Sequence, residues 1–135
     1  MNKQHTLGKT ERLKSRKKIE QLFMEGKSFV VPPFRIYHRT SGRESMKNAE
    51  NGLQFGTGVS NKSFKKAVDR NRIKRLTREA WRLQNSELKD KMKQTGKQLH
   101  VFFIYTGKEI PDYKLVSEKI KTAVQKLLMI VDQKG

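Results

Sequence analysis

Cysteine is absent from this chain of 135 residues, and carboxylates are few. Without thiols, the sequence excludes disulfide bonds, iron–sulfur clusters, thiolate zinc sites and thiol catalysis. The 13 Asp and Glu residues are scattered or lie beside basic residues, as Asp69 does beside Arg70, whereas a metal-dependent nuclease needs several carboxylates around a divalent ion. His5, His38 and His100 are far apart in sequence. The residues therefore predict no metal site and no catalytic group in the protein.

Long hydrophobic segments near the start and glycine-rich nucleotide loops are also missing. The polar, basic residues 1–18 predict neither a signal peptide nor a membrane span, which favours a cytoplasmic protein. No glycine loop of the Walker or Rossmann kind supports nucleotide chemistry. We expect one domain over residues 1–135, with a flexible basic tail at residues 1–14, and a monomer in the free state.

Positive charge is what the chain has in excess. Its 31 basic and 13 acidic residues give a net charge of +18. Self-repulsion of that size costs stability, and the usual reason to carry it is a phosphate-rich partner whose binding releases counterions. A basic amphipathic helix can instead lie on anionic lipid, but only Trp81 brings a large apolar group near the cations. The composition therefore favours nucleic acid over a membrane.

The densest charge lies in residues 61–82, where the spacing is helical. Four cations recur at four-residue steps and form what we call the cationic stripe: Arg70, Lys74, Arg78 and Arg82. Asn71 and Arg75 lie beside it. Four apolar residues follow helical steps on the opposite side: Ile73, Leu76, Ala80 and Leu83. We expect a helix, beginning at about Phe64 or Ala67, that buries one face and presents its cations to a polyanion.

The rest of the chain predicts helices and strands around this basic helix. A short first helix is expected after Ser15 as its N-cap, ending at Gly26 as a left-handed C-cap. Residues 28–40 predict a strand that Pro32-Pro33 confines to an edge or a bulge at that point. Residues 53–60 predict a second strand, in which Gly56 and Gly58 share one face and allow a backbone, a helix or a ligand to approach.

The second half of the chain completes the predicted sheet. Residues 84–97 are a charged connection, into whose first part the basic helix could persist. Residues 99–106 are almost continuously apolar, typical of a strand that is buried on both faces near the sheet centre. Asp112 can cap a last, core-forming helix. The order predicts an α/β fold (an α+β sandwich) with a central mixed β-sheet and about three helices packed on it.

Two of these elements could bind a ligand. The Ile19/Phe23 side of the first helix either covers the core or faces a groove. On one strand face, Arg35 and Arg39 flank Tyr37, an arrangement that could stack on single-stranded nucleic acid or be an ordinary solvated face. Two hypotheses follow, an RNA-binding part of a larger assembly and a DNA-binding or architectural protein. The exposed aromatic between cations favours RNA, since major-groove readers usually are compact helical motifs.

Residues 70–79, RNRIKRLTRE, resemble the RNR signature of the bacterial ribonuclease P protein family. The flanks are also similar to that family: FGTGVS at 55–60, Lys62, KKA at 65–67 and WRL at 81–83. The specific likeness covers residues 55–83, while elsewhere only length and element order agree. Three positions depart from the family pattern. Ile19 replaces a frequent aromatic, Asn61 a frequent lysine and Trp81 a frequent phenylalanine, and we expect Trp81 to be partly buried.

The resemblance implies a protein subunit of ribonuclease P, an endoribonuclease that removes the 5′ leader from precursor tRNA. In that family the RNA subunit cuts with Mg²⁺ ions that it mainly holds, and the protein is its cofactor. The implied contacts to the catalytic RNA are Lys62, Lys65, Lys66, Arg70, Asn71, Arg72, Lys74, Arg75, Arg78 and Arg82. The implied leader contacts are Ile19, Phe23, Tyr37 and Arg35. The resemblance also implies a left-handed βαβ crossover. The alternative is a general RNA-binding or ribosome-associated basic protein without a role in tRNA processing.

Overall fold

The structure is a computed structural model that describes residues 12–13, 15–41 and 52–133. Most of the predicted tail and the segment 42–51 lie outside the described residues. The elements in chain order are α1 (Arg16–Glu25), β1 (Lys27–Val31), β2 (Phe34–Ser41), β3 (Leu53–Val59), α2 (Ala67–Gln84), α3 (Ser86–Thr95), β4 (Gln98–Tyr105) and α4 (Tyr113–Gln133). Within these ranges, no helix is both long and apolar enough to cross a membrane.

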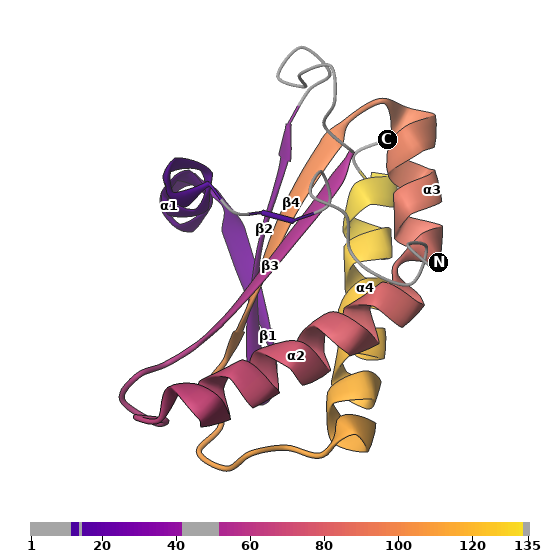
Figure 1. Ribbon diagram of the computed structural model, residues 1–135. Helices are drawn as coiled ribbons and strands as arrows, with labels where there is room; N and C mark the ends of the chain where they lie inside the picture. The colour runs from indigo at the N-terminus through magenta and orange to yellow at the C-terminus, as the bar shows by residue number, and fades with distance from the viewer. Residues whose placement is uncertain (1–11, 14, 42–51, 134–135) are drawn as a thin grey trace, which may run out of the picture.

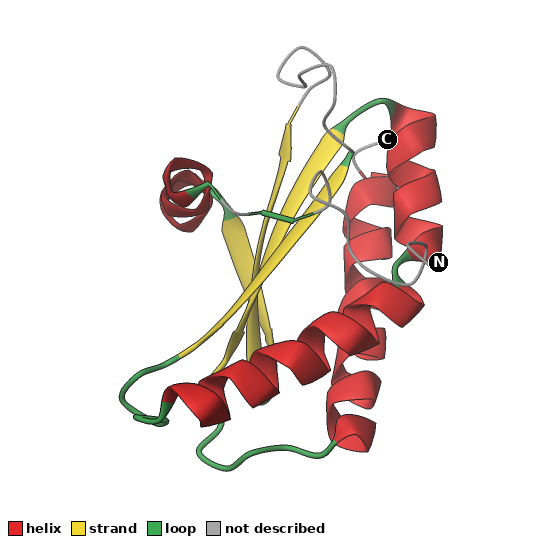
Figure 2. Cartoon of the chain, in the orientation of Figure 1, coloured by secondary structure: helices red, strands yellow, loops and turns green. Residues whose placement is uncertain are grey.

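The four strands form one mixed sheet in the order β1-β2-β4-β3. β1 pairs with β2 and β2 with β4 in antiparallel fashion, whereas β3 and β4 are parallel. Figures 1 and 2 show α1 on one side of the sheet and the other three helices on the opposite side. The predicted α+β architecture with a central mixed sheet is therefore confirmed. The handedness of the β3–α2–α3–β4 crossover stays an implication of the resemblance.

The prediction of a charged connection at residues 84–97 was wrong, because most of it forms a fourth helix. Leu88 and Met92, four residues apart, are buried on one face of α3. Gly96 ends the helix in the left-handed conformation, with φ 71° and ψ 12°, and its N–H donates to the Met92 carbonyl over 3.0 Å. Two buried residues in a strongly charged segment are a weak periodic pattern, which explains the error.

Gly26 follows α1 as predicted, but it is not a left-handed cap. Its φ of −82° and ψ of 177° are extended, because β1 begins at the next residue. Glycine is needed there for space. A Cβ atom would lie 2.5 Å from the Leu22 carbonyl oxygen and 2.8 Å from the His38 carbonyl oxygen. The predicted N-cap is confirmed, since the Ser15 hydroxyl accepts a hydrogen bond from the Lys18 N–H.

Pro32 and Pro33 form the turn of the β1–β2 hairpin, where Val31 pairs with Phe34. They split the predicted strand in two and leave β1 at the sheet edge. β4 lies between β2 and β3, as its apolar sequence predicts. On the face of β4 towards α1, however, Phe102 and Ile104 are only half-buried. The second half of the strand is therefore partly exposed to solvent on that face.

The core lies between the sheet and the pair α2 and α4. Trp81 is at its centre, with 1% of its surface exposed; its ring stacks on Phe55 with centroids 4.7 Å apart. It also makes an edge-to-face contact with Phe103, with ring centroids 5.6 Å apart. The prediction of partial burial for Trp81 was therefore wrong. Leu83, which the pattern assigned to the apolar face, is 57% exposed. It comes two residues after Trp81, about 200° further around the helix.

Arg12 and Leu13, the two described residues of the predicted tail 1–14, lie against the sheet. Arg12 forms a parallel bridge with Phe55 at the free edge of β3, and the Leu13 N–H donates to the Phe55 carbonyl over 2.8 Å. The Leu13 side chain is buried, with 4% of its surface exposed. This short bridge therefore fixes the chain against the sheet ahead of α1.

Candidate nucleic-acid interface

The exposed side of α2 holds a groove of about 380 Å³, which we call the α2 groove. Five residues line it: Val68, Asn71, Arg72, Arg75 and Arg78. They recur at three- and four-residue steps on the side of the helix opposite the buried Ile73, Thr77 and Ala80. Three guanidinium groups on one groove make a surface suited to phosphate, which Arg binds through two parallel N–H donors.

The α2 groove differs from the cationic stripe that the four-residue spacing predicts. A step of four residues turns about 40° beyond a full helical turn, so three steps drift by about 120°. All four stripe residues are half-buried, whereas Asn71, Arg72 and Arg75 are exposed. The stripe therefore begins beside the core, and only its later members approach the open side of the helix.

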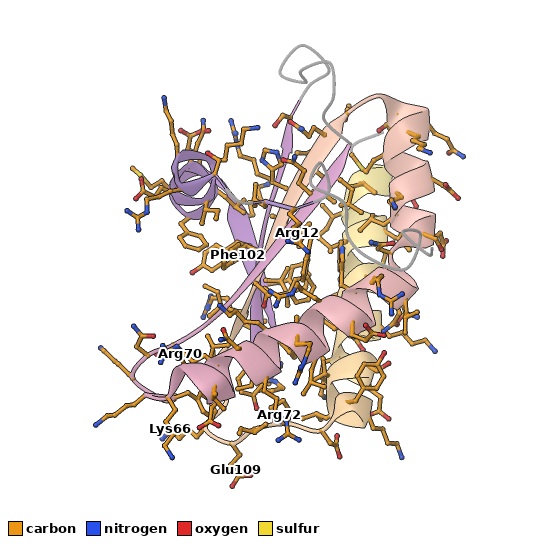
Figure 3. The ribbon with its side chains drawn as sticks, in the orientation of Figure 1. Arg12, Lys66, Arg70, Arg72, Phe102 and Glu109 are labelled. Atoms are coloured by element: carbon orange, nitrogen blue, oxygen red, sulfur yellow. The ribbon has the colours of Figure 1, made fainter. Side chains whose placement is uncertain are left out.

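Two members of the stripe have structural partners. Arg70 donates from Nη1 to the carbonyl oxygens of Phe64 and Lys65, over 2.7 and 2.8 Å, which closes the turn before α2. Arg82 forms an ion pair with Glu79 one turn earlier. Lys62, Lys65 and Lys66 are exposed around this turn, at the start of the helix (Figure 3 labels Lys66, Arg70 and Arg72 along α2).

A second surface lies between α1 and the sheet. Phe23, Tyr37 and Phe102 meet there, and we call them the aromatic cluster. The Phe23 ring lies 4.8 Å from that of Tyr37 and 5.3 Å from that of Phe102. Phe23 remains 40% exposed, although it contacts two rings. The structure thus brings together two predicted leader contacts, Phe23 and Tyr37, from elements that are separate in sequence.

Phe102 is the member that the sequence missed. It pairs with Tyr37 on β2 and Gly56 on β3, so the three residues form a row across the sheet. A Cβ atom at Gly56 would lie 2.7 Å from the Phe102 ring and 3.1 Å from the Leu13 carbonyl oxygen. The prediction that a backbone can approach this glycine is therefore confirmed, and the Phe102 ring lies closer still. Because the sequence of β4 is continuously apolar, Phe102 could not be told apart from the core residues by sequence. In the structure, Phe102 is half-buried whereas its neighbours Val101 and Phe103 are buried.

The other two predicted leader contacts lie on either side of the aromatic cluster. Arg35 is exposed two residues before Tyr37 on β2, and its Nη1 lies 3.4 Å from the Ser28 hydroxyl. Ile19 instead lines a cavity with Phe102 and Arg12, at the edge of β3. Arg12, which the sequence left in the tail, is thus a further cation at this surface (Figure 3 labels Arg12 and Phe102).

A polar hollow of about 450 Å³ lies at the far end of the same sheet face. Its lining includes Lys18 from α1, Arg39 from β2 and His100 from β4. Arg39 also pairs with Glu25 over 3.2 Å, which ties α1 to the sheet.

The two described histidines lie on opposite sides of the sheet. The His38 ring packs against Phe29, with ring centroids 5.6 Å apart. Because side chains alternate along β2, His38 is on the core side, and the two histidines form no pair.

Metal chemistry has no evident place in the described ranges. Over residues 12–13, 15–41 and 52–133, no three His, Asp or Glu side chains come together as they would to hold an ion. The surfaces above are instead cationic and aromatic, which suits binding of a polyanion.

A family model described as ribonuclease P matches residues 7–128. The chain belongs to the ribonuclease P protein family. The ribonuclease P protein component of Porphyromonas gingivalis strain W83 is 36% identical over 118 residues, covering 87% of this chain and 83% of that protein. The component of Chlorobium phaeobacteroides is 29% identical over 123 residues, covering 86% of this chain and 84% of that protein. The resemblance that residues 70–79 carry is therefore confirmed.

Solved structures of the family agree with the fold. The ribonuclease P protein from Thermotoga maritima superposes with a TM-score of 0.60 at 27% identity, covering 86% of this chain and 96% of that one. The Staphylococcus aureus protein gives a TM-score of 0.64 at 20% identity, covering 87% and 94%. Family membership makes this chain the protein component of an endoribonuclease that processes tRNA 5′ leaders, with the ribonuclease P RNA as its partner.

Proposed function

We propose that the chain binds the catalytic RNA through α2 and the turn before it, and the 5′ leader of precursor tRNA through the aromatic cluster. The observation that carries this proposal is the separation of two surfaces of different chemistry. The α2 groove is lined by guanidinium groups, whereas the cleft beside α1 exposes aromatic rings. A folded RNA presents phosphates, and a single strand also presents unstacked bases.

The α2 groove suits a structured RNA. Arg72 and Arg75 are exposed and, within the described part of the chain, make no hydrogen bond or ion pair that would compete with phosphate. Fixed on one helix face, they can neutralise neighbouring phosphates and release counterions. The exposed lysines at positions 62, 65 and 66 extend the same charge.

The aromatic cluster suits a single strand. A base can stack on the exposed part of Phe23, while Arg35 lies close enough along β2 to neutralise its phosphate. The cationic lining of the polar hollow, from Lys18 and Arg39, would attract the strand further along the same face.

Mg²⁺ belongs with the RNA in this proposal. The described residues offer no group of carboxylates or histidines that fits the ion, and octahedral Mg²⁺ keeps several waters and prefers phosphate oxygens. The protein's part is therefore to lower the repulsion between two polyanions. A free monomer and a cytoplasmic location remain our expectations; a charge of +18 opposes self-association.

A cleavage assay with purified protein, ribonuclease P RNA and precursor tRNA tests the proposal by measuring the rate of leader removal. At low Mg²⁺, we expect the protein to speed leader removal by the RNA, because it offsets phosphate repulsion. The protein without the RNA should cleave nothing. Cleavage by the protein alone would contradict an RNA-based site. A protein that binds RNA without changing the cleavage rate would instead support a general RNA-binding role.

Replacing Phe23 with Ala should weaken binding of precursor tRNA with a leader by roughly 5- to 150-fold, since one base–aromatic stack is worth about 1–3 kcal/mol. Affinity of the holoenzyme for leaderless tRNA should stay the same, as measured by equilibrium binding. Met24→Ala is the matched control, because Met24 is the next residue on α1 and is 84% exposed. An equal loss for both tRNAs would place Phe23 outside the leader path.

A further inference from the structure

The free edge of β3 lies where the surface beside α1 meets the cationic side of α2. On this edge the Phe55 carbonyl accepts from the Leu13 N–H, so the backbone groups of Phe55 point away from β4. Backbone polar groups of successive residues in a strand point to opposite edges. Thr57, two residues later, therefore directs its N–H to the same outer edge.

A cavity of about 310 Å³, which we call the edge cavity, opens there between α1, β3 and α2. Its lining includes Arg12 from the bridge, Thr57 from β3 and Arg78 from α2. The Thr57 hydroxyl oxygen is buried and has no hydrogen-bond partner among the described residues. A buried hydroxyl without a partner is costly, and such groups in native structures often mark a ligand or water position.

Arg12 and Arg78 carry like charges at this cavity. Burial lowers the pKa of the Arg78 guanidinium, and the nearby charges of Arg12 and Arg75 lower that pKa further. A guanidinium remains protonated at neutral pH, so the repulsion persists in the free protein. An anion between the two groups would relieve it. Arg78 also lines the α2 groove, so the edge cavity continues the cationic surface around the helix.

We propose that Arg12, Arg78 and Thr57 form a binding site for one phosphate group at the edge of β3, and that its ligand is an RNA phosphodiester. The two guanidinium groups supply charge-assisted donors, and Thr57 adds its hydroxyl and the outward N–H. The identity of the ligand rests on the proposed function. The phosphate comes either from the leader, which passes Phe102 beside the cavity, or from the catalytic RNA, which lies along α2.

The full chain titrated with inorganic phosphate tests the site itself by ¹⁵N–¹H NMR. We expect a saturable shift of the Thr57 amide signal in the wild type and its loss in Arg12→Gln. Thr57→Val, which keeps the side-chain shape, should weaken phosphate binding by about fivefold. Arg16→Gln, an equal charge change on an exposed arginine of α1, should leave the titration unchanged. An unresponsive Thr57 signal, or equal loss in Arg16→Gln, would overturn the proposal.

Two binding measurements with Arg12→Gln then distinguish the sources of the phosphate. Weaker binding of leader-bearing precursor tRNA to the holoenzyme, with normal assembly, assigns the phosphate to the leader. Weaker assembly with the ribonuclease P RNA assigns it to the catalytic RNA. If neither changes, no RNA phosphate occupies the site and the proposal fails. The proposed function fails separately, if wild-type protein does not speed leader removal although Thr57 still responds to phosphate.

Discussion

Replacing both Arg72 and Arg75 with Gln is expected to weaken binding to the ribonuclease P RNA about 30-fold at 0.15 M salt. Each lost phosphate contact is worth about 1 kcal/mol, and two are removed. The slope of log K against log salt should also become shallower by about two, because two fewer phosphates are neutralised. Filter binding or fluorescence anisotropy over a salt series measures both quantities.

A variant with the same charge change elsewhere is the control for this prediction. Lys114→Gln and Lys121→Gln together remove two exposed cations from α4, which covers the sheet beside α2 (Figure 1). Since they lie off the α2 groove, we expect a much smaller loss of affinity. If the α4 pair weakens binding as much as the α2 pair, net charge alone attracts the RNA and the α2 groove has no special role.

Replacing Trp81 with Ala should destabilise the fold by about 3–5 kcal/mol, the usual cost of deleting a large buried aromatic side chain. The ring fills the centre of the core, stacked on Phe55 at 4.7 Å and against Phe103 at 5.6 Å. Because native domains are stable by only about 5–15 kcal/mol, the variant should be close to unfolding at room temperature. Urea unfolding followed by circular dichroism measures the loss.

Two further substitutions test the assignment of Trp81 to the core. Trp81→Phe keeps an aromatic ring in the cavity and should cost distinctly less than Trp81→Ala. Leu83→Ala should change stability by no more than about 0.5 kcal/mol, since Leu83 is 57% exposed. If Leu83→Ala were the more damaging change, the orientation of α2 on the sheet would be wrong.

Much of the fold followed from local patterns. The caps at Ser15 and Asp112 were predictable because short polar side chains bond to the N–H groups of a following helix turn, and both bonds occur. The central position of β4 followed from its continuous apolar sequence. The fourth helix was missed, since only Leu88 and Met92 in α3 are buried and the other residues resemble a solvated connection.

The candidate interface was predictable in its chemistry but only partly in its geometry. Net charge, the RNR signature and the missing carboxylates together indicated an RNA-binding subunit without its own active site. Four-residue steps, however, gave a stripe that drifts around α2, and Arg70 in it is engaged with the carbonyl oxygens of Phe64 and Lys65. The exposed groove around Arg72 and Arg75 could be located only once the burial of each residue on α2 was known.

The sequence by itself determined the partner class and the helix with the densest positive charge, because charge and periodicity are local properties. Only the tertiary structure decided which residues meet. Phe102 joins Phe23 and Tyr37 because β4 pairs between β2 and β3. Arg12 lines the same cavity as Arg78 because the N-terminal segment adds to the edge of β3. Such contacts depend on strand order and helix orientation, which the packing of the whole core determines and no short stretch of sequence encodes.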